Sequence, residues 1–211
     1  MSLTLPKRSA ISTLLARTAD NSAYYTALTT AEGLFEITEI NELVDLRADP
    51  QYRLIRIDHR LGMEERDGFE IALVDDIELS VAYYDKVTLG RSPDIGRRKL
   101  ASNLIWRSAS NRHSRALRDI SQKVLFSYMV NDYDILLDAE AITDGGNFYW
   151  HRQVSRAIEK GLHAYAYDPT TQALRPIQTQ LALNNLQDQV WTEVNHKALI
   201  AIISNSQILR S

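Results

Sequence analysis

The sequence predicts an α/β protein of the α+β kind, with a mixed, mainly antiparallel central sheet and helices on both faces. Between residues 33 and 108, apolar, β-branched and aromatic residues recur with a period of two, as in strands that bury one face. After residue 110, helical patterns alternate with short apolar runs, an order typical of a sheet covered by helices. No internal repeat and no Gly/Ser- or Pro-rich linker interrupts the 211 residues, which favours one domain over residues 1–211.

The composition excludes several classes of protein and of site. The net charge of −3 gives no broad attraction to nucleic acid or to an anionic membrane. No run approaches the roughly 18–20 apolar residues that a membrane span needs. Cysteine is absent, which excludes disulfides, thiolate metal sites and a cysteine nucleophile. We expect a soluble, cytoplasmic protein, and secretion as a bacterial effector stays open.

Residues 1–30 are predicted to form an N-terminal helical segment. Ile11, Leu14 and Leu15 recur at helical spacing behind Pro6, which predicts an amphipathic helix over residues 7–27. The same stretch is rich in Ser and Thr, and its first 19 residues contain basic but no acidic side chains. A secretion signal is therefore the alternative interpretation of this stretch.

The strands are predicted from period-two alternation and from short apolar runs bounded by turn residues. A hairpin is expected around Asp75 and Asp76, and a second one around Pro169, Thr170 and Thr171. The loop at residues 90–98 has two glycines, a proline and three arginines and is expected to be exposed. The predicted strands are 33–40, 52–58, 69–74, 77–87, 104–108, 133–138, 162–168, 173–177 and 197–204.

Three further helices follow from apolar residues at helical spacing. The first covers residues 114–130, with Leu117, Ile120, Val124 and Tyr128 on one stripe. The second covers residues 147–160, with Asp144 as its cap and Gly161 at its end. The third covers residues 179–193. The inner face of the second helix is predicted to consist of Phe148, His151, Val154, Ser155 and Ile158.

The order of these elements resembles that of the GNAT superfamily of acyl-CoA-dependent N-acyltransferases. In that family a helical N-terminal part and a β-meander precede a central strand, which enters a helix through a loop that binds the pyrophosphate of CoA. A further strand, a second helix and a C-terminal strand pair follow. The resemblance covers about residues 50–180 and implies transfer of an acyl group to an amine of a small molecule or a protein.

The resemblance places a cofactor-binding loop around NRHSRAL, residues 111–117, and implies acetyl-CoA or another acyl-CoA as the cofactor. Backbone N–H groups at a helix N-terminus bind phosphates, and arginines add positive charge. The family's loop usually has the pattern Arg/Gln-x-x-Gly-x-Gly/Ala, and here both glycines are missing. The expected cofactor-binding residues are Arg107, Arg112, His113, Ser114, Arg115 and Ala116.

The catalytic residues are expected where the apolar run YDILLD ends and on the helix that follows. Asp138 lies at the carboxyl end of this strand, where open α/β sheets place their sites. Asp138 or His151 would be the general base, and Tyr149 would donate a proton to the departing thiolate. The family often has that tyrosine near the end of its second helix, where this chain has Ala157 and Ile158. Alternatively, Asp138 belongs to a helix-capping group and His151 is a hydrogen-bonded core residue.

A metal-dependent transferase is a further hypothesis. Asp132 and Asp134 could hold Mg²⁺ or Mn²⁺, because hard cations favour carboxylates. Side chains two apart on a strand point the same way, which would allow a shared site. An Asx-type turn before the strand is the preferred explanation of these aspartates, so no metal is expected.

The alternative to an enzyme is a non-catalytic bacterial or phage-encoded interaction protein that has a related fold without acyl transfer. The missing glycines and the acid-poor N-terminus favour it. A local excess of arginine favours an anion site over nucleic acid, since no basic strand with interleaved aromatic residues accompanies it. These arginines are Arg91, Arg97, Arg98, Arg107, Arg112, Arg115 and Arg118.

Overall fold

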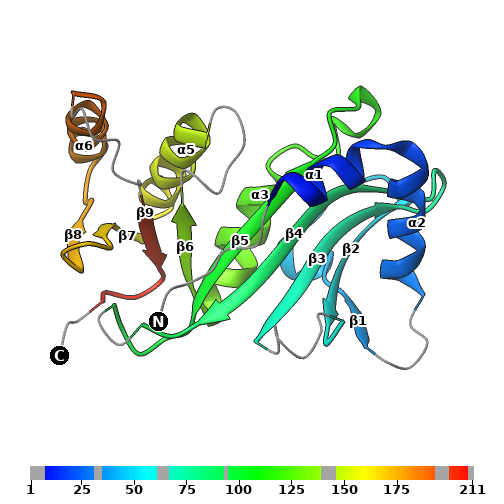
Figure 1. Ribbon diagram of the computed structural model, residues 1–211, viewed down its shortest axis with the longest axis horizontal. Coiled ribbons are helices and arrows are strands. Elements are labelled where there is room, and N and C mark those ends of the chain that lie inside the picture. The colour runs from blue at the N-terminus through cyan, green and yellow to red at the C-terminus, as the bar shows by residue number, and fades with distance from the viewer. Residues whose placement is uncertain are drawn as a thin grey trace. The chain divides into compact units, whose positions relative to one another are not determined.

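The computed structural model describes residues 8–30, 35–60, 67–92, 95–138, 146–192 and 200–208. It contains a nine-stranded sheet with the strand order β1-β2-β3-β4-β5-β6-β9-β7-β8 (Figure 1). The sheet is mixed and mostly antiparallel, so the predicted fold class is confirmed. The chain packs as two compact units, one from Met1–Thr88 with Leu104–Val124, and one from Leu89–Asn103 with Leu125–Ser211.

The first unit contains an antiparallel meander. Strands β1 (Glu36–Glu39), β2 (Tyr52–Asp58), β3 (Gly68–Asp75) and β4 (Ser80–Gly90) pair in chain order. A 3-10 helix, η1 (Glu42–Val44), lies between the first two. All four strands were expected from the alternating pattern, and the β3–β4 turn lies where the Asp75–Asp76 hairpin was predicted.

Two helices cover one face of this meander (Figure 1), where a single helix over residues 7–27 was predicted. They are α1 (Arg8–Ala16) and α2 (Thr18–Thr29), and extended backbone at Arg17 (φ −90°, ψ 127°) separates them. The Asn21 amide explains why the chain turns here. Its Nδ2 donates to the Leu15 carbonyl at 2.9 Å and to the Val81 carbonyl at 3.1 Å, and its Oδ1 accepts from the Val81 N–H at 2.7 Å. Asn21 thus fixes both helices to strand β4.

The second unit contains the start of the fifth strand, the last four strands and, as its two longest helices, α5 (Gly146–Glu159) and α6 (Gln180–Thr192). Strand β6 (Asp134–Asp138) pairs in parallel with β5 (Leu100–Arg107) through Leu100–Ser102. Strand β9 (Ile200–Ser204) lies between β6 and β7 (His163–Asp168), antiparallel to both, and β8 (Ala173–Pro176) forms the edge. Helix α5 packs against β7 and β9, and α6 packs against α5. Both hairpins and both helices were predicted; the Asp144 cap lies outside the described residues.

The segment between β5 and β6 differs from the helix predicted over residues 114–130. A 3-10 helix, η3 (Asn111–His113), is followed by turns, and helical backbone begins only at α3 (Ile120–Lys123). It continues through a π-helix, η4 (Val124–Met129), into α4 (Val130–Asp132). The predicted start is wrong because Asp119 has left-handed backbone (φ 56°), which a continuous α-helix excludes. Among the described helices, none is long and apolar enough to cross a membrane.

Candidate functional site

The predicted cofactor-binding segment lies in the first unit, at the end of β5 and in the turns after it. Arg107, Arg112, Ser114 and Arg115 are exposed, whereas His113 and Ala116 are buried. Arg107 donates from Nη2 to the carbonyl of Leu117 at 2.8 Å and so closes the segment onto itself. Contacts of this segment with an anion would therefore come from the exposed members.

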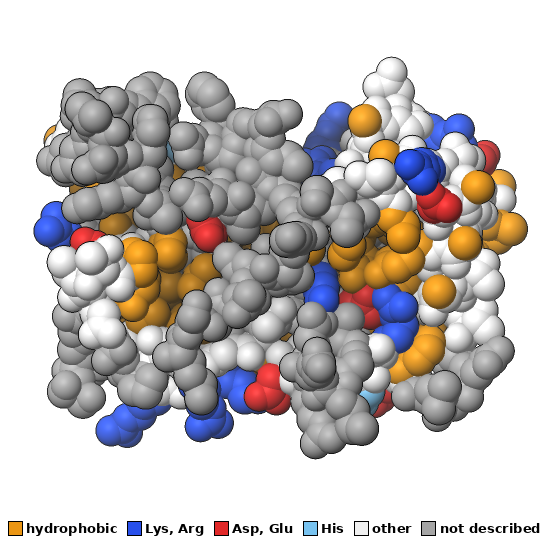
Figure 2. Space-filling view, viewed as in Figure 1, with side chains coloured by type: hydrophobic (Ala, Val, Ile, Leu, Met, Phe, Trp, Pro, Cys, Tyr) orange, Lys and Arg blue, Asp and Glu red, His pale blue; other side chains and the backbone are white. Residues whose placement is uncertain are grey.

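Two of the exposed arginines face carboxylates. The Nη1 of Arg112 lies 2.6 Å from Oε2 of Glu78, in the turn between β3 and β4. Arg115 lies 3.7 Å from Asp49. Basic and acidic side chains are likewise interspersed, not segregated, on the face shown in Figure 2. The charges of Arg112 and Arg115 are thus partly compensated by nearby acids.

His113 forms a buried polar cluster with residues that sequence reasoning did not select. Its Nδ1 is 3.0 Å from the Tyr52 hydroxyl and 3.8 Å from Oδ2 of Asp75. The Asp75 carboxylate also accepts from the side-chain amide of Gln51 and from two backbone N–H groups in the β3–β4 turn, those of Ile77 and Glu78. The sequence signal for Asp75 was its position in the predicted turn, but its partner His113 is 38 positions further along the chain.

Burial lowers the pKa of His113 below its ordinary value. The charge of Arg112 acts in the same direction, while Asp75 and Glu78 raise the pKa and only partly offset the loss of hydration. The ring is therefore neutral at pH 7. It accepts or donates one hydrogen bond through Nδ1 and does not supply a positive charge for phosphate binding at that pH.

The neutral state of His113 makes stability depend on pH. In the unfolded chain the imidazole binds a proton as the pH falls through about 6.5, while in the folded chain it binds one only at lower pH. The free energy of unfolding should therefore fall with pH below about 6.5, by at most about 1.4 kcal/mol per pH unit for this group. We expect His113→Gln to flatten this slope in urea unfolding between pH 7.5 and 5.

The exposed His163 of β7 is the matched control for this experiment, since His163→Gln removes an imidazole from the surface of the protein. The slope of His163→Gln should equal that of the wild type. An unchanged slope in His113→Gln would contradict a buried neutral ring.

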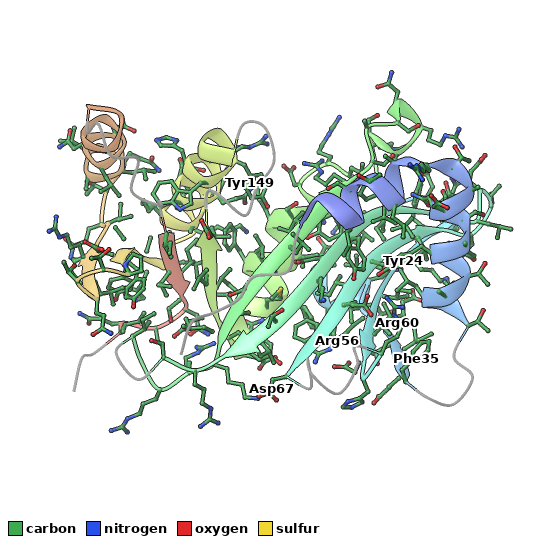
Figure 3. All side chains as sticks on the ribbon, in the orientation of Figure 1. Tyr24, Phe35, Arg56, Arg60, Asp67 and Tyr149 are labelled. Atoms are coloured by element: carbon green, nitrogen blue, oxygen red, sulfur yellow. The ribbon has the colours of Figure 1, made fainter. Side chains whose placement is uncertain are left out.

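The predicted catalytic residues lie in the second unit. Asp138 is the last residue of β6 and pairs with Ile200 of β9. Tyr149 lies near the start of α5 (Figure 3), and His151 is two residues further on. Two positions on an α-helix differ by about 200°, so these side chains leave opposite flanks of α5. His151 Nε2 lies 3.1 Å from Oδ1 of Asn184 on α6.

The inner face of α5 is different from the one predicted. Trp150, Gln153, Val154 and Ala157 are buried, and of the predicted set only Val154 belongs to this face. His151, Ser155 and Ile158 are half-buried flanking residues, and the side chain of Phe148 lies outside the described residues. The reason is that Trp150, the largest apolar side chain of the helix, lies at the centre of the buried face. The buried face is therefore shifted by about one residue from the predicted one.

The proposed pair of metal ligands is divided between two elements. Asp132 ends α4, whereas Asp134 begins β6, so the two do not share a strand face as the period-two argument required. Asp134 is buried and lies 3.3 Å from Nε of Arg98. Burial raises the pKa of Asp134, while Ser204 and Arg98 lower it. Within the described part of the chain, no group of three or more His, Asp or Glu side chains could hold a metal ion.

A second buried polar cluster surrounds Glu70 on β3, whose side chain is inaccessible to solvent. Arg60 donates to both carboxylate oxygens, and the Tyr84 hydroxyl donates to Oε1 at 2.5 Å. Tyr24 of α2 lies 3.2 Å from the same oxygen, 3.1 Å from Tyr84 and 2.8 Å from Arg60, which it approaches in Figure 3. Burial, together with the charge of Glu70, raises the pKa of Tyr84 far above its ordinary value. The cluster is fully paired, which indicates a structural role.

Comparisons with known proteins add no relative to this description. No protein-family model matches the chain. Neither the curated proteins nor the solved structures contain a significant match.

Proposed function

We propose that the chain is a GNAT-like acyltransferase that binds an acyl-CoA near Arg107–Ala116 and transfers the acyl group to an amine. The observation that carries the proposal is the element order. A helical N-terminal part and a β-meander precede β5, and an arginine-bearing segment then leads into a helix. After it come β6, in parallel with β5, the helix α5, and the C-terminal strands. In this order of elements the chain resembles the GNAT superfamily.

The chemistry needs one base and one acid. The amine nitrogen attacks the thioester carbonyl, the carbon–sulfur bond breaks, and the thiolate of CoA takes up a proton. Asp138 or His151 removes the proton of the amine, and Tyr149 protonates the thiolate. Tyr149 and His151 leave opposite flanks of α5, so a substrate on one flank would meet only one of these two side chains.

The first test is binding of the cofactor. A ligand of the native state raises the melting temperature by mass action, so millimolar acetyl-CoA or CoA should stabilise the wild type. The double variant Arg112→Ala, Arg115→Ala should lose this shift, because the two guanidinium groups of residues 111–117 are then removed. Differential scanning fluorimetry measures both.

Arg47→Ala provides the control, since Arg47 is also an exposed arginine of the first unit, 3.1 Å from an acid, Asp45. Its shift with acetyl-CoA should equal that of the wild type. No stabilisation of the wild type by either ligand would contradict acyl-CoA binding.

A non-catalytic interaction protein is the second candidate function, and one observation favours it. Ile77 and Leu79 are 71% and 50% exposed in the β3–β4 turn, on either side of Glu78. Apolar side chains displayed next to a charged pair suit a protein contact. A folded protein that responds to neither acetyl-CoA nor CoA would favour this function.

A further inference from the structure

The ion pair of Arg112 with Glu78 is fixed at both ends by buried groups. Glu78 follows Asp75 by three residues, and its backbone N–H donates to the Asp75 carboxylate at 3.1 Å. Arg112 precedes the buried His113, and its carbonyl accepts from the Tyr52 hydroxyl at 3.5 Å. Both partners are therefore held by short connections to the same buried cluster, although 34 positions separate them in the sequence.

The other ion pair of the segment is looser. The Arg115 and Asp49 side chains are 84% and 53% exposed and 3.7 Å apart. The Arg112 and Glu78 side chains are 57% and 49% exposed and 2.6 Å apart. A carboxylate held this close to a guanidinium acts as a tethered competitor, because its effective concentration exceeds that of most free anions.

We propose that Glu78 is a specificity-determining residue, an internal counter-anion that occupies Arg112 until a pyrophosphate group displaces it. The inference rests on the proposed function, since it assigns Arg112 to the pyrophosphate of the cofactor. A singly charged carboxylate offers Arg112 no more than Glu78 already does. A pyrophosphate carries more charge and more acceptor oxygens, so it displaces Glu78 where acetate or a carboxylate metabolite does not.

Isothermal titration calorimetry of the full chain with inorganic pyrophosphate, at low ionic strength, tests the proposal. Glu78→Gln keeps the size of the side chain and removes the competing charge. Its Kd for pyrophosphate should be about fivefold lower than that of the wild type. This factor corresponds to the largest stabilisation usual for an exposed ion pair, which pyrophosphate no longer has to break in the variant. Added sodium acetate should weaken pyrophosphate binding more in Glu78→Gln than in the wild type.

Two variants separate this effect from a general change of charge. Asp45→Asn also removes one acid from an exposed ion pair, with Arg47, and should leave the Kd unchanged. The double variant Arg112→Ala, Glu78→Gln should bind pyrophosphate no more tightly than the wild type, because removing Glu78 helps only when Arg112 is present to bind the ligand.

Equal affinities of Glu78→Gln and wild type would overturn the inference, as would an equal gain in Asp45→Asn. Absence of pyrophosphate binding by every variant at 10 mM, roughly a hundred times a Kd of about 0.1 mM, would also overturn it. Glu78→Gln could bind pyrophosphate more tightly while acetyl-CoA leaves the melting temperature of the wild type unchanged. That outcome would support the role of Glu78 and contradict the proposed acyl transfer.

Discussion

Replacing Glu70 with alanine is expected to lower the free energy of unfolding by about 3–5 kcal/mol. The substitution leaves the guanidinium of Arg60 without its carboxylate and removes the acceptor of the buried Tyr84 hydroxyl. An uncompensated charge or donor in a low-dielectric interior costs far more than an ion pair at the surface contributes. Guanidinium chloride unfolding, followed by circular dichroism, measures the change.

Two further variants show whether the loss comes from the broken cluster. Glu36→Ala removes an exposed glutamate from strand β1 of the same unit and should change stability by less than about 0.5 kcal/mol. The double variant Arg60→Met, Glu70→Leu should be more stable than Glu70→Ala, because apolar side chains of similar volume replace both charges together. A loss in Glu70→Ala no larger than that in Glu36→Ala would contradict the cluster.

The strands could be predicted because their pattern depends on local residue order alone. Period-two alternation predicted the strands of the meander, and an almost wholly apolar run predicted β6 and correctly indicated its burial. The helix boundaries depend on single residues. Arg17 and Asp119 are compatible with a helix by composition, yet neither has helical backbone, and at Arg17 the contacts of Asn21 with Leu15 and Val81 hold the break.

The buried charges could not be predicted for a different reason. In the sequence of β3, Phe69, Ile71 and Leu73 alternate with Glu70, and a strand with this alternation ordinarily buries its apolar face and exposes the other. Helices α1 and α2 cover that second face, so Glu70 is buried and needs the partners it has in Tyr24, Tyr84 and Arg60. The residue pattern of a strand shows which side chains share a face. It does not show which other element packs against the second face.

The candidate site has the same limitation. Residue type and position selected Arg112, His113 and Arg115, and the structure places all three in one segment. Their partners Glu78, Asp75 and Asp49 come from the meander, between 34 and 66 positions earlier in the sequence. Pairing across such separations follows from strand register, which no local pattern specifies.

Replacing Trp150 with alanine should have an effect as large as that of Glu70→Ala, in the second unit. Trp150 is 1% exposed at the centre of the inner face of α5, and α5 packs against β7 and β9. Removing a buried indole forfeits its transfer free energy and leaves a cavity, at a cost of about 3–5 kcal/mol. Trp150→Phe retains an aromatic ring, so its free energy of unfolding should fall clearly less than that of Trp150→Ala. Equal losses of stability in the two variants would contradict tight packing of the indole.

Together, Glu70→Ala and Trp150→Ala decide whether the two compact units are one domain in the thermodynamic sense. Glu70 belongs to the first unit and Trp150 to the second, and strands β4 and β5 contribute residues to both. If the chain unfolds as a single cooperative domain, each variant lowers the midpoint temperature of the same unfolding transition. The calorimetric and van't Hoff enthalpies then agree. If the units unfold separately, each variant should lower one of two transitions and leave the other in place. We expect the single transition, because β4 and β5 each run without interruption from one unit into the other.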